Sequence, residues 1–428
     1  MSMMHRRMFG TLLAAAPLAA GAQPMDWKAR RSQYRKDLFE DYVPFHEKYV
    51  VDKQYGGFHC TVTPSGQLVS AGKTAWYEGR GTWVFSYLYN HFGKEQKYLD
   101  IAARSLRLIE KSRPTGDAFW PKALARDGAA ASPADTEVYS DLFIAEGMAE
   151  FSKAAADQRY WDDAKQIVLK CVRRYDLPDY HPSIGQTYLG PNAPAFPGAR
   201  VLGVWMVLIR ATTQMLAMRP DAELQHINDR SIDAILNRHY NPRFRLLNEL
   251  IRHDYSRPRD DYEKFVYAGH AIETLWMVMD EALRRKDNAL FDRVAELFER
   301  HCEVAQDRVF GGLLRNLRNV DTNDWTLDKT LFPHQEALIG ALMMIEQTGD
   351  AWAQRFYTTL DEYTRAHFPM KKLGSPLWQV IGDRHVTPTP DMKRAENYHH
   401  PRYLMLNLLR VERLLQRNGK PLRSDKRG

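Results

Sequence analysis

The chain has 428 residues, of which 44% are hydrophobic and 11% aromatic, so it can bury a large core. Its formal net charge is +7, and Lys and Arg are mixed with Asp and Glu along the whole length. This mixture argues against nucleic acid as a partner, because proteins that bind it gather positive charge in one block or on one face.

The first 22 residues have the pattern of a cleavable export signal. His5, Arg6 and Arg7 supply positive charge, an apolar run extends from Leu12 to Ala20, and small residues end the segment before Gln23. Such a run is too short to span a bilayer and is typical of a removable secretory signal. The adjacent arginines also resemble a twin-arginine signal. We therefore expect a periplasmic protein whose mature chain has no membrane span.

Helical periodicity dominates the rest of the chain and predicts about twelve helices. They are expected over residues 26–49, 76–92, 95–112, 135–156, 159–175, 199–218, 220–239, 261–285, 288–301, 330–348, 351–367 and 394–416. Short turns such as Gly93-Lys94 and Gly349-Asp350 alternate with connections of about two dozen residues, which are much longer than ordinary loops. This alternation places all the long loops at one end of a helical bundle.

The fold that satisfies this alternation is an (α/α)6 barrel, in which six inner and six outer antiparallel helices form a toroid. We expect one catalytic domain over residues 23–418 and a solvated basic tail over residues 419–428. An α-solenoid or two separate bundles would be the alternative, but no linker divides the chain.

Two of the long loops resemble copies of each other. The sequence YGGF at 55–58 precedes KT at 73–74, and FGGL at 310–313 precedes KT at 329–330. A toroid built from duplicated helix pairs would produce this repetition.

The segment 264–283 is apolar nearly all round, which predicts a helix buried between other elements. It carries His270 and Glu273 at i, i+3, which places both side chains on one face. A carboxylate beside a buried imidazole holds one tautomer and makes the ring more basic. The alternative is a structural core histidine hydrogen-bonded to its neighbour.

Other ionisable residues also stand near the predicted starts of inner helices. They are Arg80, Glu137, Arg200, His334, Glu336, His399, His400 and Arg402. Converging helix N-termini add positive potential, which favours an anion or a developing oxyanion. The long loops and their edges supply tryptophans, among them Trp83 and Trp378. Aromatic faces around a cavity suit a sugar, although such residues also serve as packing wedges.

Two histidines from different helices could remove a proton from one carbon and return it on the opposite face. An arginine such as Arg80 would stabilise the oxyanion formed beside a carbonyl. This chemistry needs no metal and no redox cofactor, and we expect neither. A metal site from His270, His399 and His400 is the alternative, but these residues lack a chelating motif.

A glycosidase is a second alternative, because it needs two carboxylates that flank the scissile bond. The candidate carboxylates for that reaction are Glu137, Glu249, Glu273 and Glu336.

Six short motifs resemble the N-acylglucosamine 2-epimerase superfamily, which includes cellobiose 2-epimerases and mannose isomerases. They are GGF at 56–58, EGRGTW at 78–83, PGAR at 197–200, GHAIE at 269–273, QEAL at 335–338 and YHHPR at 398–402. They occur in the family's order across nearly the whole mature chain. The resemblance implies an (α/α)6 barrel, the fold that the loop alternation also predicts.

The resemblance also implies roles for individual residues. Arg80 matches the arginine that binds the O1/O2 edge of the sugar, and His270 and His399 match the two acid/base histidines. His399 is preferred to His400 because the family histidine stands three residues before the arginine. Glu273 matches the carboxylate beside the first histidine. The residues expected to contact the substrate are Glu336, Trp83, Arg200, Trp378, Arg402 and His334.

The chain departs from the family pattern at LFPHQE, residues 331–336. Loss of a tryptophan platform there argues against a disaccharide substrate, and His334 replaces a glutamine. We expect a sugar 2-epimerase or isomerase for an aldose, such as N-acetylglucosamine or N-acetylmannosamine, working as a monomer or homodimer. The alternatives are a glycoside hydrolase and a sugar-binding protein without activity.

Overall fold

The computed structural model describes residues 25–182, 189, 192–193 and 196–423. The predicted export signal therefore lies outside the described residues.

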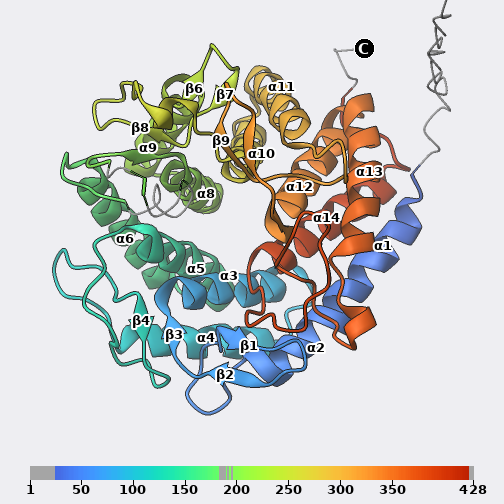
Figure 1. Ribbon diagram of the computed structural model, residues 1–428. Helices are drawn as coiled ribbons and strands as arrows, with labels where there is room; N and C mark the ends of the chain where they lie inside the picture. The colour runs from blue at the N-terminus through green and yellow to red at the C-terminus, as the bar shows by residue number, and fades with distance from the viewer. Residues whose placement is uncertain (1–24, 183–188, 190–191, 194–195, 424–428) are drawn as a thin grey trace, which may run out of the picture.

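Six helices form an inner ring around a central axis (Figure 1). They are α3 (Ala75–His91), α5 (Tyr139–Ala155), α8 (Leu202–Met218), α10 (Ala268–Arg285), α12 (Leu331–Thr348) and α14 (His399–Gln416). Each packs against the next, and α14 packs back against α3. This closure confirms the (α/α)6 barrel and contradicts a solenoid or two bundles.

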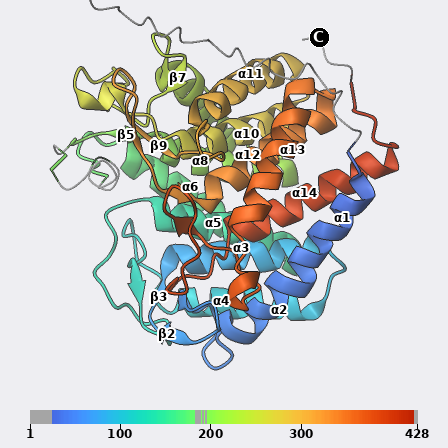
Figure 2. The same ribbon diagram turned by 45° about the vertical axis from the view of Figure 1, so that its right-hand side comes forward.

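Each inner helix has an outer partner. The outer layer consists of α4 (Gln96–Glu110), α6 (Gln158–Asp176), α9 (Ala222–Asp233), α11 (Asn288–Ala305), α13 (Ala351–His367) and α1 (Trp27–Lys36) with its continuation through α2 (Val43–Phe45) to Val50. In Figure 2, α1 runs alongside α14, which it covers from outside. The two layers differ in burial, because inner helices are enclosed by neighbours while outer helices keep a solvent face. In α12, for example, every residue except Phe332 is buried.

The long connections form short antiparallel strand pairs. These are β1 (Thr61–Val62) with β2 (Leu68–Ser70), β3 (Lys73–Thr74) with β4 (Ala123–Leu124), β5 (Arg200–Val201) with β8 (Leu250–Ile251), β6 (Tyr240–Asn241) with β7 (Leu246–Leu247), β9 (Asn316–Asn319) with β10 (Asp324–Thr326), and β11 (Lys329–Thr330) with β12 (Ile381–Gly382). Strands β3, β5 and β11 lead directly into inner helices and pair with strands of a different connection. The connections therefore brace one another at the end where the inner helices begin.

The two similar loops have the same internal bonds. Lys73 Nζ lies 3.1 Å from Asp52 Oδ2, and Lys329 Nζ lies 3.2 Å from Asp307 Oδ2. Each lysine also donates to a glycine carbonyl of its own loop. Each aspartate accepts a further bond from an arginine of another connection: Arg126 and Arg384. The predicted sequence repeat is thus also a structural repeat.

The repeat extends into the first turn of the following helix. Five residues after each lysine, a buried side chain accepts a loop N–H: Glu78 Oε1 from Phe58 at 2.9 Å, and His334 Nε2 from Leu313 at 2.9 Å. Burial raises the pKa of Glu78 to about 7 and lowers that of His334 to about 3. Burial therefore favours the uncharged form of both acceptors.

Some helices begin later than predicted. Helix α10 begins at Ala268 rather than at residue 261, because Val266 forms a β-bridge with Leu317 that keeps the preceding backbone extended. Helix α14 begins at His399 rather than at residue 394, and the Glu396 carboxylate accepts the backbone N–H groups of Tyr398 and His399.

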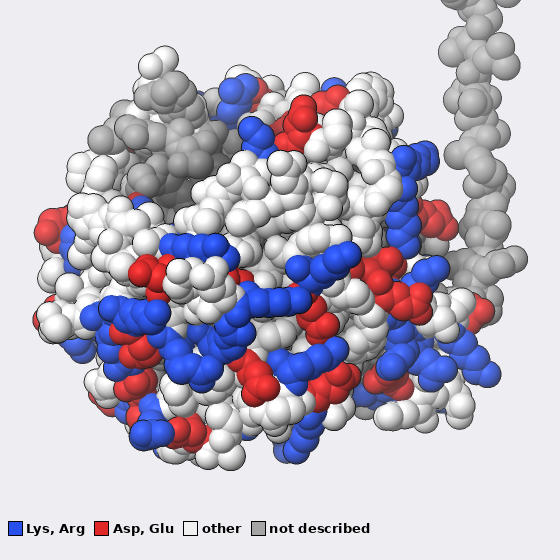
Figure 3. Space-filling model, turned by 90° about the horizontal axis from the view of Figure 1, so that it is seen from below, with Lys and Arg blue, Asp and Glu red and all other residues white. Residues whose placement is uncertain are grey.

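Lys and Arg alternate with Asp and Glu over the face shown in Figure 3. Leu422 and Arg423 donate backbone N–H groups to carbonyls at the end of α12, so the predicted tail is docked at its start. No helix in the described ranges is long and apolar enough to cross a membrane. Cys60, Cys171 and Cys302 are free.

Candidate active site

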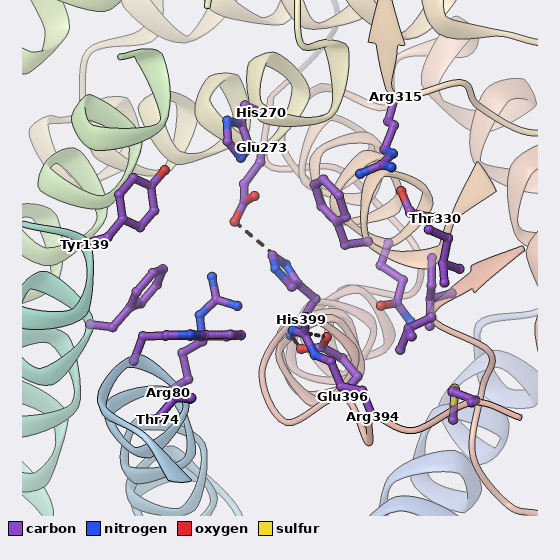
Figure 4. A pocket seen from close by; sticks show the side chains of 18 of the residues that line it. Thr74, Arg80, Tyr139, His270, Glu273, Arg315, Thr330, Arg394, Glu396 and His399 are labelled. Atoms are coloured by element: carbon purple, nitrogen blue, oxygen red, sulfur yellow. Dashed lines mark hydrogen bonds and ion pairs between the residues drawn. The ribbon is translucent and has the colours of Figure 1, made fainter. Parts of the chain in front are cut away.

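A cavity of about 980 Å³ opens at the end of the barrel where the inner helices begin. Residues from the first two turns of all six inner helices and from the braced connections line it. Figure 4 shows that its charged groups come from different helices and face a common space. All four residues predicted to be catalytic are among them: Arg80, His270, Glu273 and His399.

His399 is held by a carboxylate of the neighbouring helix. Its Nδ1 lies 2.9 Å from Glu336 Oε1, and Trp276 Nε1 donates to the other oxygen at 2.7 Å. Because a carboxylate accepts, Nδ1 carries the proton and the lone pair is on Nε2. Burial, helped by the charges of Arg402 and Arg80, lowers the pKa of His399 to about 3. The ring is therefore neutral at pH 7 and can accept a proton.

Arg402 lies beneath His399 and binds two buried carboxylates. Its Nη2 lies 2.7 Å from Glu336 Oε1 and also contacts Glu273, which is 3.9 Å from His399 Nδ1. Glu273, Glu336 and His399 come close enough together to hold a metal ion. The Arg402 guanidinium, fully buried between the carboxylates, supplies positive charge at that place.

His270 has a different carboxylate partner from the one we predicted. Its Nδ1 lies 2.9 Å from Oε1 of Glu249, which comes from the turn between β7 and β8. Glu273 follows His270 by one helical turn, but its carboxylate binds Arg402 instead. Both histidines thus have Nδ1 bonded to a carboxylate from another element.

Arg80 enters the cavity through an aromatic cage. Its Cζ lies 4.0 Å from the Phe143 ring centroid, 4.5 Å from that of Trp76 and 4.7 Å from that of Tyr398. Within the described ranges, Nε of Arg80 has no hydrogen-bond partner. Burial lowers the pKa of Arg80, but a guanidinium remains charged in proteins. Aromatic faces hold the cation without neutralising it, which leaves its N–H groups for a ligand.

Glu396 occupies the entrance to α14. Although burial opposes its ionisation, Arg394, His399 and Arg80 lower its pKa to about 2. It also accepts the N–H of His399 at 3.1 Å. Glu396 is therefore ionised at neutral pH and fixes the first residue of the helix, which is the histidine of the cavity.

The family model described as "N-acylglucosamine 2-epimerase (GlcNAc 2-epimerase)" matches residues 56–401. The chain belongs to the N-acylglucosamine 2-epimerase family. An N-acylglucosamine 2-epimerase of Bos taurus is 26% identical over 344 residues, which are 76% of this chain and 78% of the relative.

Solved structures of other epimerases and isomerases share the fold. A cellobiose 2-epimerase from Bacillus thermoamylovorans is 18% identical with a TM-score of 0.75, covering 90% of this chain and 100% of that one. A D-mannose isomerase is 15% identical with a TM-score of 0.71, covering 91% and 99%.

In this family member, the six residues predicted to contact substrate lie outside the cavity lining. Glu336 and Arg402 lie directly beneath His399, as described above. Trp83 is fully buried, and its Nε1 donates to Gln214 Oε1 at 2.8 Å. Arg200 donates to the carbonyls of Asp176 and Leu177 at the end of α6 and to that of Gly198, so it ties that helix terminus to its own loop.

The remaining two of the six residues are Trp378 and His334. The ring of Trp378 packs 4.8 Å from that of His400, whose Nδ1 lies 2.6 Å from Gln335 Nε2. His334 bonds backbone groups through both nitrogens, to Thr330 O at 2.8 Å and Leu313 N at 2.9 Å. Trp378 therefore packs against α14, and His334 bonds the backbone before its own helix and that of a neighbouring loop, so neither side chain lines the cavity.

Several cavity residues were not predicted. They are Tyr139, Tyr267, Arg315, Phe332, Arg394 and Glu396. The Phe332 ring lies 5.0 Å from that of His399 and 6.5 Å from that of His270, and all three side chains line the cavity. The sequence position of Glu396 could have indicated its role, because a carboxylate just before a helix is stabilised by the positive end of the helix dipole. Arg315 comes from a connection, for which helical spacing gives no signal.

Proposed function

We propose that this protein is a sugar 2-epimerase or aldose–ketose isomerase that moves the C2 proton between His270 and His399. The observation that carries this proposal is the pair of histidine–carboxylate bonds. Each ring has Nδ1 on a buried carboxylate, at 2.9 Å in both cases, so each has Nε2 available for proton transfer. The rings belong to α10 and α14 and line one cavity.

The reaction starts from an open-chain aldose, whose C1 carbonyl makes the C2 proton acidic. One histidine removes that proton, and the electron pair moves toward the carbonyl to form an enediolate. Arg80, whose guanidinium lines the cavity, stabilises the oxyanion by donating N–H groups to it. Protonation of C2 from the opposite face by the other histidine gives the epimer. Protonation at C1, with transfer of the O2 proton to O1, gives the ketose instead.

The candidate substrates are monosaccharides. Phe332 offers an apolar face beside both histidines. The C–H face of a monosaccharide, which is smaller than that of a disaccharide, can pack against it. N-acetylglucosamine and N-acetylmannosamine are the first compounds to test, because the Bos taurus relative bears the name of that activity.

A glycoside hydrolase fits the carboxylates less well. Such an enzyme needs a carboxylic acid that keeps its proton until the glycosidic oxygen takes it. Glu396 has a pKa of about 2 and is ionised, while Glu273 is paired with Arg402. Glu336 is bonded to His399 beneath the cavity.

The deciding experiment is incubation with a panel of aldoses in deuterated water, followed by NMR. The panel contains N-acetylglucosamine, N-acetylmannosamine, glucose and mannose. We expect deuterium at C2 and formation of an epimer or ketose from at least one of them. Binding without exchange would indicate a sugar-binding protein, and new reducing ends from an oligosaccharide would indicate a hydrolase. Either result would overturn the proposal.

Replacement of the histidines tests the assignment of the two bases. His270→Asn and His399→Asn should each lower net epimerisation by about a hundred- to ten-thousandfold, because each direction needs both residues. The surviving histidine should still exchange the C2 proton on its own face, so residual exchange should come from opposite epimers. Parental rates in both variants would refute the two-base mechanism.

A further inference from the structure

We propose that Glu249 is the positioning residue of His270: it fixes the ring in the tautomer that presents Nε2 to the cavity. This inference rests on the proposed function, in which His270 transfers a proton. Glu249 lies 21 residues before His270 in sequence and does not line the cavity itself.

The backbone of Glu249 is held from two sides. Its carbonyl accepts the N–H of Leu202, the first residue of α8, at 2.8 Å. Its own N–H donates to Phe265 O at 3.4 Å, just before α10. The following strand β8 pairs with β5, which leads into α8. The carboxylate is therefore placed by the start of α8 and by the segment that leads into α10, and not by a free loop.

The side chain of Glu249 is fully buried. Oε1 bonds His270 Nδ1, and Oε2 has no hydrogen-bond partner within the described part of the chain. Glu336, by contrast, also bonds Arg402 and Trp276. Arg402 therefore shares the charge of Glu336, whereas Glu249 has no arginine partner among the described residues and forms its ion pair with His270.

The surroundings of this pair also show close packing. A Cβ atom at Gly203 would lie 3.0 Å from His270 Nδ1 and would clash with the Tyr139 hydroxyl. Burial and the charges of Glu249 and Glu273 raise the pKa of Tyr139, so this phenol stays protonated beside them. The glycine thus lets α8 approach His270 and Tyr139 closely.

The test compares Glu249→Gln with Glu249→Leu. Glutamine keeps an acceptor for Nδ1–H but removes the charge, whereas leucine removes both. The matched control is Glu263→Leu, which removes a half-buried carboxylate from the same connection. The signal of His270 is identified by its loss in His270→Asn.

The first readout is the tautomer of His270, from ring nitrogen shifts in ¹⁵N NMR of the protein without substrate. We expect the Nδ1–H form in the parent, in the control and in Glu249→Gln, and loss of that form in Glu249→Leu. An unchanged tautomer in Glu249→Leu would overturn the proposal. If Glu249→Leu does not fold, the tautomer in the parent protein decides the test. A proton on Nε2 of His270 in the parent would overturn the proposal.

The second readout is C2 deuterium exchange measured separately from each epimer. Glu249→Leu should lose about a hundredfold in exchange from the epimer that His270→Asn also fails to exchange. Exchange from the other epimer, through His399, should stay at the parental rate, and Glu249→Gln should recover part of the loss. Equal losses from both epimers would show general damage and refute a positioning role. If the parent protein shows no C2 deuterium exchange, only the proposed function is refuted. The role of Glu249 is still tested, because the tautomer of His270 is measured without substrate.

Discussion

Glu78→Gln should remove a pH dependence from the stability of the barrel. The Glu78 carboxyl is fully buried, accepting Phe58 N–H at 2.9 Å and the Ser105 hydroxyl at 2.7 Å. Burial raises its pKa to about 7 from an ordinary value of 4.5. A glutamine can keep both contacts, because its oxygen accepts from Phe58 and its amide donates to Ser105.

The sign follows from where the proton is bound. Between pH 4.5 and 7 the folded protein keeps a proton on Glu78 that the unfolded chain releases, so stability falls as pH rises through this window. Each pH unit costs about 1.4 kcal/mol, and the whole interval costs about 3 kcal/mol. The parent should therefore lose about 3 kcal/mol of unfolding free energy between pH 4 and pH 8 that the glutamine variant does not lose.

The assay is urea unfolding followed by tryptophan fluorescence at pH 4, 5, 6, 7 and 8. The quantity of interest is the difference in unfolding free energy between variant and parent at each pH. Glu40→Gln, on the exposed side of the first outer helix, controls for the loss of a carboxylate. A difference that stays constant within about 1 kcal/mol from pH 4 to pH 8 would refute the reasoning.

Three further predictions concern the site and the export signal. Arg80→Lys should lose about a hundred- to thousandfold in turnover with an unchanged circular dichroism spectrum, because lysine lacks the planar fork; near-parental turnover would count against its role. Gly203→Ala should lower turnover by displacing His270 while helix content is kept. An unaffected rate would show that a methyl group fits beside Tyr139 and His270 without moving them. We propose twin-arginine export, so replacing Arg6 and Arg7 by lysine should leave precursor in the cytoplasm; unchanged export would indicate the general secretory route.

The architecture could be predicted because it depends on local patterns. Alternating connection lengths indicate antiparallel helix pairs, and closure of the ring follows from having six of them. The starts of α10 and α14 were less predictable. They depend on Val266 pairing with Leu317 and on Glu396 bonding the backbone of His399, and both contacts form only in the folded chain.

The site was predictable only in part for the same reason. Helical spacing correctly brought His270 and Glu273 to one cavity, since both lie on one face of a single helix. It could not identify Glu249 as the partner of His270, because that carboxylate comes from a separate connection. His334 shows the converse case: a polar residue near a predicted helix start bonds the backbone of a neighbouring loop instead of facing the axis.

The position of α14 has a consequence for how the protein is made. Glu273 and Glu336 belong to α10 and α12, and their buried counter-ion Arg402 belongs to the last helix. During synthesis these carboxylates exist before the arginine does, and a buried carboxylate without its partner is costly. A growing chain therefore has no low-energy way to close the barrel early. The centre with its second histidine, His399, forms only when synthesis is nearly complete, so a prematurely terminated chain would be unstable as well as inactive.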